Sequence, residues 1–286
     1  MTELERKETQ AIDLIRSASK HREYVVSYSG GKDSEVLLHL FQKAKVSFQI
    51  VYRNTTIDPP YTLQHVKKRG ATILQPKYRF FELIRKKGLP SFARRFCCEY
   101  LKEPYIAPYL ALGIRREESK ARAENYVEPL TCRIYTKKKH TEQLLPLLYW
   151  NLEDITNYIG LDNIECHPLY YDENGRFCPK TRLGCLGCPL PWDRSIDDFK
   201  KYPRLVRIWC RNLREFRLNH PNTHANDLFR SEYDQFANNL FYHGLDTFNA
   251  STYGLFPIDW HERLQEIFHI DLSRAVTCLW GDVFET

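Results

Sequence analysis

Six consecutive residues near the N-terminus have the types and spacing of an anion-binding loop. The segment Ser29-Gly30-Gly31-Lys32-Asp33-Ser34 follows a β-branched run and precedes an apolar pattern with helical periodicity. Two glycines let the backbone approach a ligand closely and turn its N–H groups outward. Those N–H groups, the positive end of the following helix, the Ser29 and Ser34 hydroxyls and the Lys32 charge together form a seat for phosphate. The alternative is an ordinary strand-to-helix turn, in which a Gly-Gly pair is common.

Four of the nine cysteines have the spacing of metal ligands. A turn with the pattern of Cys185-x-x-Cys188 brings two thiolates to one metal, and the adjacent pair Cys97-Cys98 supplies two more. Adjacent cysteines are awkward ligands for a tetrahedral zinc, whose paired ligands are usually spaced by two or more residues. An iron–sulfur cluster, zinc and free thiols are the three alternatives. Small buried hydrophobic residues are the default interpretation of Cys132, Cys166, Cys178, Cys210 and Cys278.

Alternating strands and helices must position the loop. The predicted strands are 24–28, 48–52, 71–74 and 109–114. The predicted helices are 2–20, one ending near Ala44, one ending near Arg69, 80–87 and one beginning near Asn151. This succession predicts an α/β fold with a doubly wound, mostly parallel sheet. Ligands bind such sheets beyond the carboxyl ends of the strands, where the glycine loop falls.

The loop lacks the spacing of the common nucleoside-triphosphate loop, Gly-x-x-x-x-Gly-Lys-Ser/Thr. It resembles instead the Ser-Gly-Gly-x-Asp-Ser pyrophosphate loop (PP-loop) of the adenine nucleotide α-hydrolase superfamily. Later motifs continue the likeness: Arg-Arg-Glu-Glu-Ser-x-x-Arg at 115–122, Pro-Leu-Tyr at 168–170 and Gly-Cys-x-x-Cys at 184–188. Their order resembles the iron–sulfur branch of the phosphoadenylyl-sulfate (PAPS) reductase family over about residues 22–190.

That resemblance implies roles for the matching residues. Lys32, Asp33 and Arg116 would be catalytic, with Asp33 near an ATP-bound Mg²⁺ as a direct or indirect ligand. Arginine suits the binding of oxyanions because its guanidinium donates two parallel hydrogen bonds. Pairing of these arginines with Glu117 or Glu118 on a helix face is the alternative. The implied nucleotide-binding residues are Ser29, Gly30, Gly31, Asp33, Ser34, Asn54, Thr55, Arg115, Ser119 and Arg122.

Two further positions bear on the resemblance. Thr56 stands where the family has the glycine of a Thr-Gly pair that contacts the nucleotide. The cysteine pattern implies a [4Fe–4S] cluster, with zinc as the alternative, on Cys97, Cys98, Cys185 and Cys188.

The resemblance implies an enzyme that acts on an adenine nucleotide: ATP, adenylyl sulfate (APS) or PAPS. Reductases of the family resemble one another in a Glu-Cys-Gly-x-His motif, which does not surround Cys278 in this sequence. Reduction of APS or PAPS and cleavage of ATP at its α-phosphate in sulfur metabolism are therefore both expected activities. An ATP pyrophosphatase of a DNA or RNA sulfur-modification system and a catalytically silent, nucleotide-binding regulatory subunit are the alternatives.

We expect two domains: a PP-loop nucleotide-binding domain with the cysteine cluster at 1–190, and a helical C-terminal extension at 191–286. In the extension, residues 200–218 predict a basic amphipathic helix whose basic face fits a protein partner or a nucleic acid. The arginines of that face are Arg204, Arg207, Arg211 and Arg214, and the apolar face carries Leu205, Trp209, Leu213 and Phe216.

Composition sets outer bounds. A chain of 286 residues accommodates one large domain with an extension, and the net charge of +6 suits an anionic partner such as a nucleotide. No apolar run approaches the ~20 residues of a membrane span. Nine cysteines without an export signal predict reduced thiols or metal ligands, and hence a cytoplasmic protein. A homodimer is compatible with the sequence.

Overall fold

The structure is a computed structural model that describes residues 1–286 except 92, 137, 191, 243–244, 255–256 and 274–286. The chain forms two compact units. Unit 1 comprises Met1–Asn54, Pro59–Gln75 and Pro104–Gly184, and unit 2 comprises Thr55–Asp58, Pro76–Glu103 and Cys185–Thr286. The chain passes between the units more than once, and the domain boundary near residue 190 stays a prediction. Cys278 lies outside the described residues.

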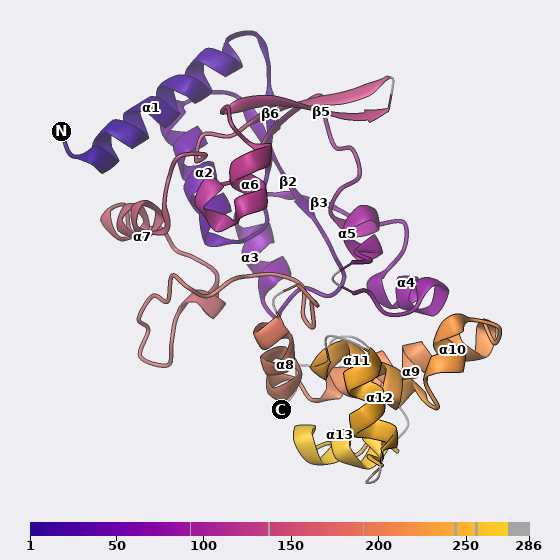
Figure 1. Cartoon of the computed structure of the whole chain (residues 1–286). Coiled ribbons are helices and arrows are strands. Elements are labelled where there is room, and N and C mark those ends of the chain that lie inside the picture. The colour runs from indigo at the N-terminus through magenta and orange to yellow at the C-terminus, as the bar shows by residue number, and fades with distance from the viewer. Residues whose placement is uncertain (92, 137, 191, 243–244, 255–256, 274–286) are drawn as a thin grey trace. The chain divides into compact units, whose positions relative to one another are not determined.

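Unit 1 is built on a six-stranded sheet with the order β3-β2-β1-β4-β6-β5. Neighbouring strands are parallel except for β5, which runs antiparallel to β6 at the edge (Figure 1). The α/β fold with a mostly parallel sheet is thus confirmed. The strands are β1 Tyr24–Ser27, β2 Phe48–Arg53, β3 Thr72–Leu74, β4 Tyr109–Ala111, β5 Leu130–Thr136 and β6 Lys139–Leu144.

Helices cover this sheet and share its core. Apolar residues of α1, α2 and α7 pack with the side chain of Val26 from β1, and Leu37 and Phe41 of α2 are fully buried. Short polar side chains start several helices: Thr2 begins α1 and Asn151 begins α7 through reciprocal capping hydrogen bonds. The helices of unit 1 are α1 Glu3–Ala18, α2 Lys32–Ala44, α3 Thr62–Lys68, α6 Lys120–Asn125 and α7 Leu152–Leu161, with short 3₁₀ turns η1 Ser19–His21, η2 Arg116–Glu118 and η3 Pro168–Tyr170.

Two features of unit 1 differ from the sequence prediction. The fourth strand, β4, ends at Ala111 rather than at residue 114. The β5–β6 hairpin was not predicted. Its two strands mix apolar and polar residues, many of them exposed, and the two residues between the strands are lysines. Hairpin turns are recognised from Gly, Asn or Asp at those positions.

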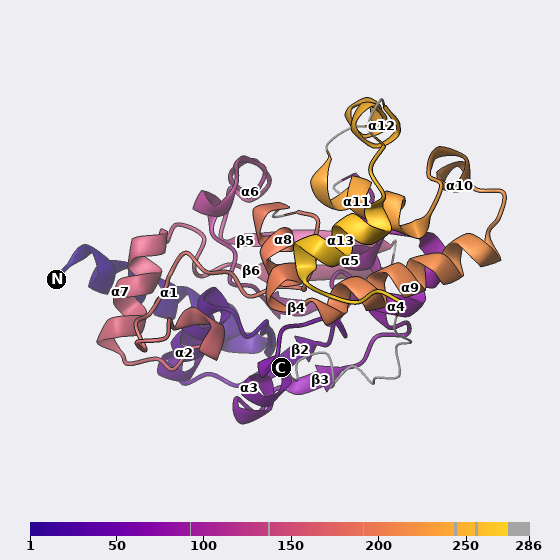
Figure 2. The same cartoon turned by 90° about the horizontal axis from the view of Figure 1, so that it is seen from below.

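Unit 2 is helical among its described residues, and its core is aromatic. Trp209 of α9 lies against the rings of Phe80, Phe199 and Phe236 with centroids 5.2 to 6.2 Å apart. Helix α11 packs on both α9 and α13 (Figures 1 and 2). The helices are α4 Phe80–Lys87, α5 Phe96–Leu101, α8 Trp192–Lys201, α9 Arg204–Asn219, α10 His224–Leu228, α11 Glu232–Phe241, α12 Leu245–Tyr253 and α13 Trp260–Phe268.

The helical C-terminal extension is therefore confirmed. Its amphipathic helix is α9, which begins at Arg204 after Pro203 rather than at residue 200, because residues 200 and 201 end α8. Helix α9 buries the four apolar side chains expected to share a face: Leu205, Trp209, Leu213 and Phe216. Among the described residues, no helix is both long and apolar enough to cross a membrane.

Candidate functional site

The glycine loop connects β1 to α2 with a backbone that requires its first glycine. Gly30 has φ +76°, in the left-handed region that L side chains rarely adopt. A Cβ on Gly30 would also lie 3.1 Å from the Leu183 side chain. Gly31 then begins α2 as its N-cap, and it has no side chain to occupy the first N–H groups of the helix.

Two hydroxyls hold the loop in this shape. Ser34 donates a hydrogen bond to the Gly31 carbonyl at 2.7 Å and accepts one from the Ser29 N–H at 3.2 Å. The Ser29 hydroxyl in turn accepts from the Gly31 N–H at 3.3 Å. The structure thus brings the predicted serines and glycines together, and the serines brace the loop as well as presenting hydroxyls.

Tyr170 also supports the start of α2. Its hydroxyl accepts hydrogen bonds from the Lys32 N–H at 3.2 Å and from the Leu183 N–H at 3.3 Å. Tyr170 belongs to η3, which His167 caps by accepting from the Leu169 N–H. The Pro-Leu-Tyr motif marks the position of Tyr170 in the sequence but does not predict this role.

A buried charge cluster lies at the start of α2. The Asp33 carboxylate accepts from Arg115 Nε at 2.5 Å and lies 3.5 Å from the Lys32 ammonium. Lys32 and Arg115 are each only 4% exposed. The chain after β4 approaches the helix closely, because a Cβ on Gly113 would lie 3.0 Å from the Asp33 carbonyl oxygen. Arg115 also forms an ion pair with Glu117 at 2.8 Å.

Positive charge exceeds negative charge around this cluster. Burial lowers the pKa of Lys32, and the nearby positive charges of Arg115 and Arg182 lower it further, against the opposing effect of Asp33. Burial likewise lowers the pKa of Arg122, with Arg182 as the largest electrostatic contribution. An anion bound among these groups would stabilise their charged forms. Arg182 was missed by the sequence analysis, because no family motif included it.

The remaining residues of the Arg-Arg-Glu-Glu-Ser-x-x-Arg motif have local partners. Arg116 donates to the Ala123 carbonyl at 3.2 Å, and its guanidinium lies 5.9 Å from the centre of the Tyr149 ring. Ser119 caps α6 by accepting from the Arg122 N–H. The Arg122 side chain forms an ion pair with Glu118. These side chains lie on the turn after β4, and their binding roles stay predictions.

The segment after β2 lies at the division between the units. Asn54, in unit 1, donates from its side chain to Gln75 at 2.9 Å. Thr55, in unit 2, is buried and its hydroxyl accepts from the Cys185 thiol at 3.5 Å. Thr56 has φ +60°, the conformation for which the family uses glycine, and its hydroxyl accepts from the Phe80 N–H at 2.8 Å. A β-branched residue at positive φ is an outlier that marks local strain.

A buried polar network beneath the loop was also unforeseen. Glu35 of α2 is 2% exposed and accepts hydrogen bonds from the Tyr28 hydroxyl and the His65 ring. Its second oxygen lies 3.1 Å from Arg69 Nε. The neighbouring His167 is fully buried, and burial together with His65 lowers its pKa to about 4. In the folded protein at neutral pH, the His167 ring is therefore uncharged.

All four predicted metal-binding cysteines lie in unit 2. Cys97 and Cys98 occupy the first turn of α5, and the Cys97 thiol donates a hydrogen bond that lowers the pKa of Cys98, assisted by Lys102 and Arg95. The pKa of Cys97 is raised by that same pairing, by burial and by the charges of Cys98, Cys185 and Cys188. Hydrogen bonding and charge from Cys185 and Cys98 raise the pKa of Lys102.

The chemistry of this donor set fits a thiolate-bound metal or cluster. Four thiols lie within electrostatic range of one another, and two cations stabilise thiolate charge beside them. In the described ranges, however, no three His, Cys, Asp or Glu side chains are arranged closely enough to hold a metal ion. The four positions are thus grouped without having the geometry of a bound site.

The sequence is similar to that of several known proteins. The profile of the phosphoadenosine phosphosulfate reductase domain matches residues 23–191. Similar proteins include an uncharacterised protein of Methanocaldococcus jannaschii, 29% identical over 74% of this chain and 53% of its own length. Sulfate adenylyltransferase subunit 2 of Vibrio cholerae is 30% identical over 59% of this chain and 68% of its own length. The chain therefore spans about half of the first relative and about two thirds of the second.

Two solved structures are distant neighbours. The PAPS reductase of Candida auris has a TM-score of 0.40 at 15% identity, covering 58% of this chain and 89% of its own. The U34-tRNA thiolase of Methanococcus maripaludis, with its [4Fe-4S] cluster, has a TM-score of 0.40 at 14% identity, covering 77% of this chain and 82% of its own. The domain profile covers more than half of the sequence and includes the glycine loop, the arginine motif and the first residues of unit 2's last segment. By that match, the chain belongs to the phosphoadenosine phosphosulfate reductase domain family.

Proposed function

We propose that this protein binds ATP at the start of α2, cleaves it between the α- and β-phosphates and transfers the AMP group to an oxyanion acceptor. The single observation that carries this proposal is the surplus of buried positive charge around Lys32 and Arg115 beside the glycine loop. Pyrophosphate, the product that leaves, is the most highly charged part of the nucleotide. A site built to stabilise it lowers the energy of the transition state in which its charge develops.

Residues of the loop and of the arginine motif would each have a role in this reaction. An acceptor oxygen attacks the α-phosphorus, the bond to the bridging oxygen breaks, and that electron pair leaves with pyrophosphate. The loop N–H groups and Lys32 would stabilise the β- and γ-phosphate oxygens, while Arg115, held by Asp33, would lie against the bridging oxygen. Arg116 and Arg122 would orient the α-phosphate, and Asn54 would contact the nucleoside.

A magnesium ion fits this arrangement through a single carboxylate. Mg²⁺ commonly binds one or two carboxylates together with phosphate oxygens, and Asp33 is the carboxylate in the charge cluster. When bound, Mg²⁺ neutralises charge on the phosphate oxygens. Asp33 already contacts two cations, so its oxygens are oriented by Lys32 and Arg115 before any ion arrives.

The relatives suggest the acceptor to test first. The name sulfate adenylyltransferase describes transfer of an adenylyl group to sulfate, and this chain shares 28 to 30% identity with several such subunits. Sulfate, an oxyanion, fits the chemistry proposed here. That name also describes one subunit of an assembly, which favours a protein partner for this chain.

Reduction of an adenylyl sulfate, APS or PAPS, is the second candidate, favoured by the family to which residues 23–191 belong. The same loop would then hold the phosphosulfate instead of pyrophosphate. The assay that separates the two supplies APS or PAPS with a thiol donor and measures sulfite. Sulfite formation without pyrophosphate formation from ATP would replace the first proposal by the second.

We propose further that Cys97, Cys98, Cys185 and Cys188 hold a [4Fe–4S] cluster. Their shared unit, the lowered pKa of Cys98 and the cations at Arg95 and Lys102 support this assignment over free thiols. Anaerobically purified protein should be brown, absorb near 400 nm and contain iron and sulfide in about equal amounts. One zinc per chain and no visible absorption would support the zinc alternative.

The central experiment measures products from ATP labelled at the α-phosphate. Protein, Mg²⁺ and ATP are incubated with and without sulfate, and labelled AMP or APS is measured together with pyrophosphate. The proposal expects labelled product and pyrophosphate in equal amounts, lost in Arg115→Gln and retained in the control Arg263→Gln. Binding of ATP without any product, across sulfate and DNA or RNA acceptors, would favour the regulatory-subunit alternative; product only with nucleic acid would favour a sulfur-modification enzyme.

A further inference from the structure

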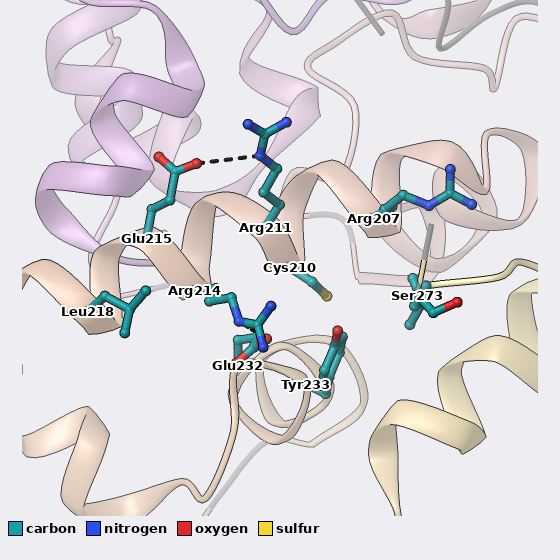
Figure 3. Close-up of a pocket in the computed structure, with 10 residues that line it drawn as sticks. Arg207, Cys210, Arg211, Arg214, Glu215, Leu218, Glu232, Tyr233 and Ser273 are labelled. Atoms are coloured by element: carbon teal, nitrogen blue, oxygen red, sulfur yellow. Dashed lines mark ion pairs between the residues drawn. The ribbon is translucent and has the colours of Figure 1, made fainter. Parts of the chain in front are cut away.

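Unit 2 contains a hollow that is lined by three arginines (Figure 3). Its volume is about 400 Å³, and one wall is the basic face of α9. Arg207, Arg211 and Arg214 line this wall, while Tyr233 of α11 lines another. Figure 3 shows the Tyr233 hydroxyl and the Cys210 sulfur pointing toward one another within it. All of these residues belong to unit 2, so the hollow is built independently of the glycine loop.

The arginines of the hollow differ in how their charge is balanced. Arg214 Nε lies 3.2 Å from Glu232, and Arg211 Nε lies 3.4 Å from Glu215. Glu215 is also shared, because Arg85 Nε lies 3.5 Å from its other oxygen. Of the side chains that line the hollow, three carry a guanidinium group and two carry a carboxylate. The hollow and its rim carry net positive charge.

Among the residues that the structure describes, Arg207 forms no ion pair with a carboxylate. Its guanidinium donates to the Asp271 backbone carbonyl, which has no formal charge to offset it. Within the described part of the chain, its Nε is buried and has no hydrogen-bond partner. A buried charged donor without a partner is costly, and an acceptor in the hollow would remove that cost. The described residues therefore leave the Arg207 Nε donor without a partner, and an acceptor bound in the hollow would supply one.

The size of the hollow indicates more than a simple ion. Four oxygens at about 30 Å³ each, the volume of a liquid water, need roughly 120 Å³. The hollow offers about 400 Å³, within the range of small-molecule sites. Its remaining walls include the apolar side chains of Leu218 and Leu272 and the ring of Tyr233. Leu272 and Tyr233 would contact the uncharged part of a ligand.

We propose that this hollow binds a small molecule through a tetrahedral oxyanion group, a phosphate or sulfate ester, held by Arg207 and Arg211. The site is separate from the nucleotide site proposed above and does not depend on ATP chemistry. Guanidinium is suited to this group because it donates two parallel hydrogen bonds to a pair of oxygens. The ligand's organic part lies against Leu272 and Tyr233.

Methyl NMR of the full chain tests this proposal with defined probes. Glycerol 3-phosphate, inorganic phosphate and inorganic sulfate are titrated while the methyl signals of Leu272 report the hollow and those of Leu37, on α2, report the loop. We expect saturable shifts at Leu272, with tighter binding of glycerol 3-phosphate than of inorganic phosphate. The sulfate arm shows whether sulfate esters share the site. Absence of a saturable shift at Leu272 with all three probes overturns the proposal.

Matched variants assign the effect to the hollow. Arg207→Gln should weaken the affinity for glycerol 3-phosphate, as read from the Leu272 methyl signal, at least tenfold. Arg263 is an exposed arginine of α13, and Arg263→Gln should not change this affinity. Lys32→Met should abolish only the Leu37 response, which separates this site from the nucleotide site. If Arg207→Gln fails to fold, Arg211→Gln replaces it with the same expectation. Unchanged affinity in a folded Arg207→Gln or Arg211→Gln variant contradicts the proposal.

Discussion

The hydroxyl of Tyr170 accepts a hydrogen bond from the backbone N–H of Lys32, at 3.2 Å, and one from Leu183 at 3.3 Å. A side chain 138 residues along the chain thus supports the first turn of α2. This hydrogen bond holds the first turn of α2 in place beside the loop. Anion binding depends on the N–H groups of the loop and of that turn. The loop is consequently a product of the fold of unit 1, rather than of its own sequence alone.

Tyr170→Phe should therefore weaken both stability and anion binding. Two buried N–H groups lose their acceptor, which costs about 1 to 3 kcal/mol. We expect a lower free energy of unfolding in urea and about tenfold weaker pyrophosphate binding by calorimetry. Tyr171→Phe is the matched control, since among the described residues the Tyr171 hydroxyl accepts from the Cys166 N–H and not from α2. Equal pyrophosphate affinity in both variants would contradict a role for Tyr170 at the loop.

Lys32→Met should separate stability from binding. The pKa of buried Lys32 is lowered, so below that pKa its charge opposes folding, and stability rises with pH between the lowered value and the ordinary lysine value. Methionine removes this cost but also removes a charged donor, worth about 1.5 to 3 kcal/mol toward phosphate. We expect pyrophosphate binding to weaken roughly 10- to 100-fold with no loss of stability. Lys120→Met, on exposed α6, should change neither.

The buried His167 predicts a specific acid sensitivity. Its Nδ1 accepts the Leu169 N–H, so protonation there would break the cap of η3 that carries Tyr170. Its pKa is lowered to about 4 from about 6.5, so the unfolded chain binds more protons between these values. Stability is fully present above about pH 6.5 and falls as the pH drops toward 4, by at most about 3 kcal/mol.

Asparagine is the informative substitution at this position, because its side-chain oxygen also accepts from a helix N–H but does not titrate. The free energy of unfolding of His167→Asn should change less between pH 6.5 and pH 4 than that of the wild type. His21→Asn, at an exposed position, should leave the pH dependence as it is. Parallel pH profiles for the wild type and His167→Asn would show that another group causes the sensitivity.

Cys98→Ser should remove bound metal or cluster. The Cys98 thiol has a lowered pKa because Cys97 donates to its thiolate and Lys102 and Arg95 lie near it, whereas a serine hydroxyl stays protonated at neutral pH. Metal analysis of anaerobically purified protein should show loss of most of the iron, or of the zinc. Cys132→Ser changes an exposed cysteine of β5 and serves as the control. Retention of full metal content by Cys98→Ser would exclude Cys98 as a ligand.

Local sequence signals were sufficient for the loop and for most of the sheet. Gly30 and Gly31 were identified from residue type alone, and strands β1 to β3 lie within a residue or two of their predicted ranges. The arginines of α9 and their opposite apolar face were equally visible, because a helical period is a local property. Each of these predictions depended on neighbours in the sequence.

Long-range partners could not be read from the sequence. Tyr170 and Arg182 reach the start of α2 only because the chain after β6 returns to it, and no short pattern encodes that return. The His65 and Arg69 contacts to Glu35 are of the same kind. The positive φ of Thr56 was also hidden, since its residue type argues against that conformation.

The most direct test is a pyrophosphate titration of the protein labelled with ¹⁵N, followed through the backbone amide signals of the loop. Our account predicts that the amides of Gly30, Gly31 and Asp33 shift together in a saturable manner, and that Arg115→Gln weakens this response at least tenfold. Saturable binding of pyrophosphate that leaves these three amides unmoved would contradict it.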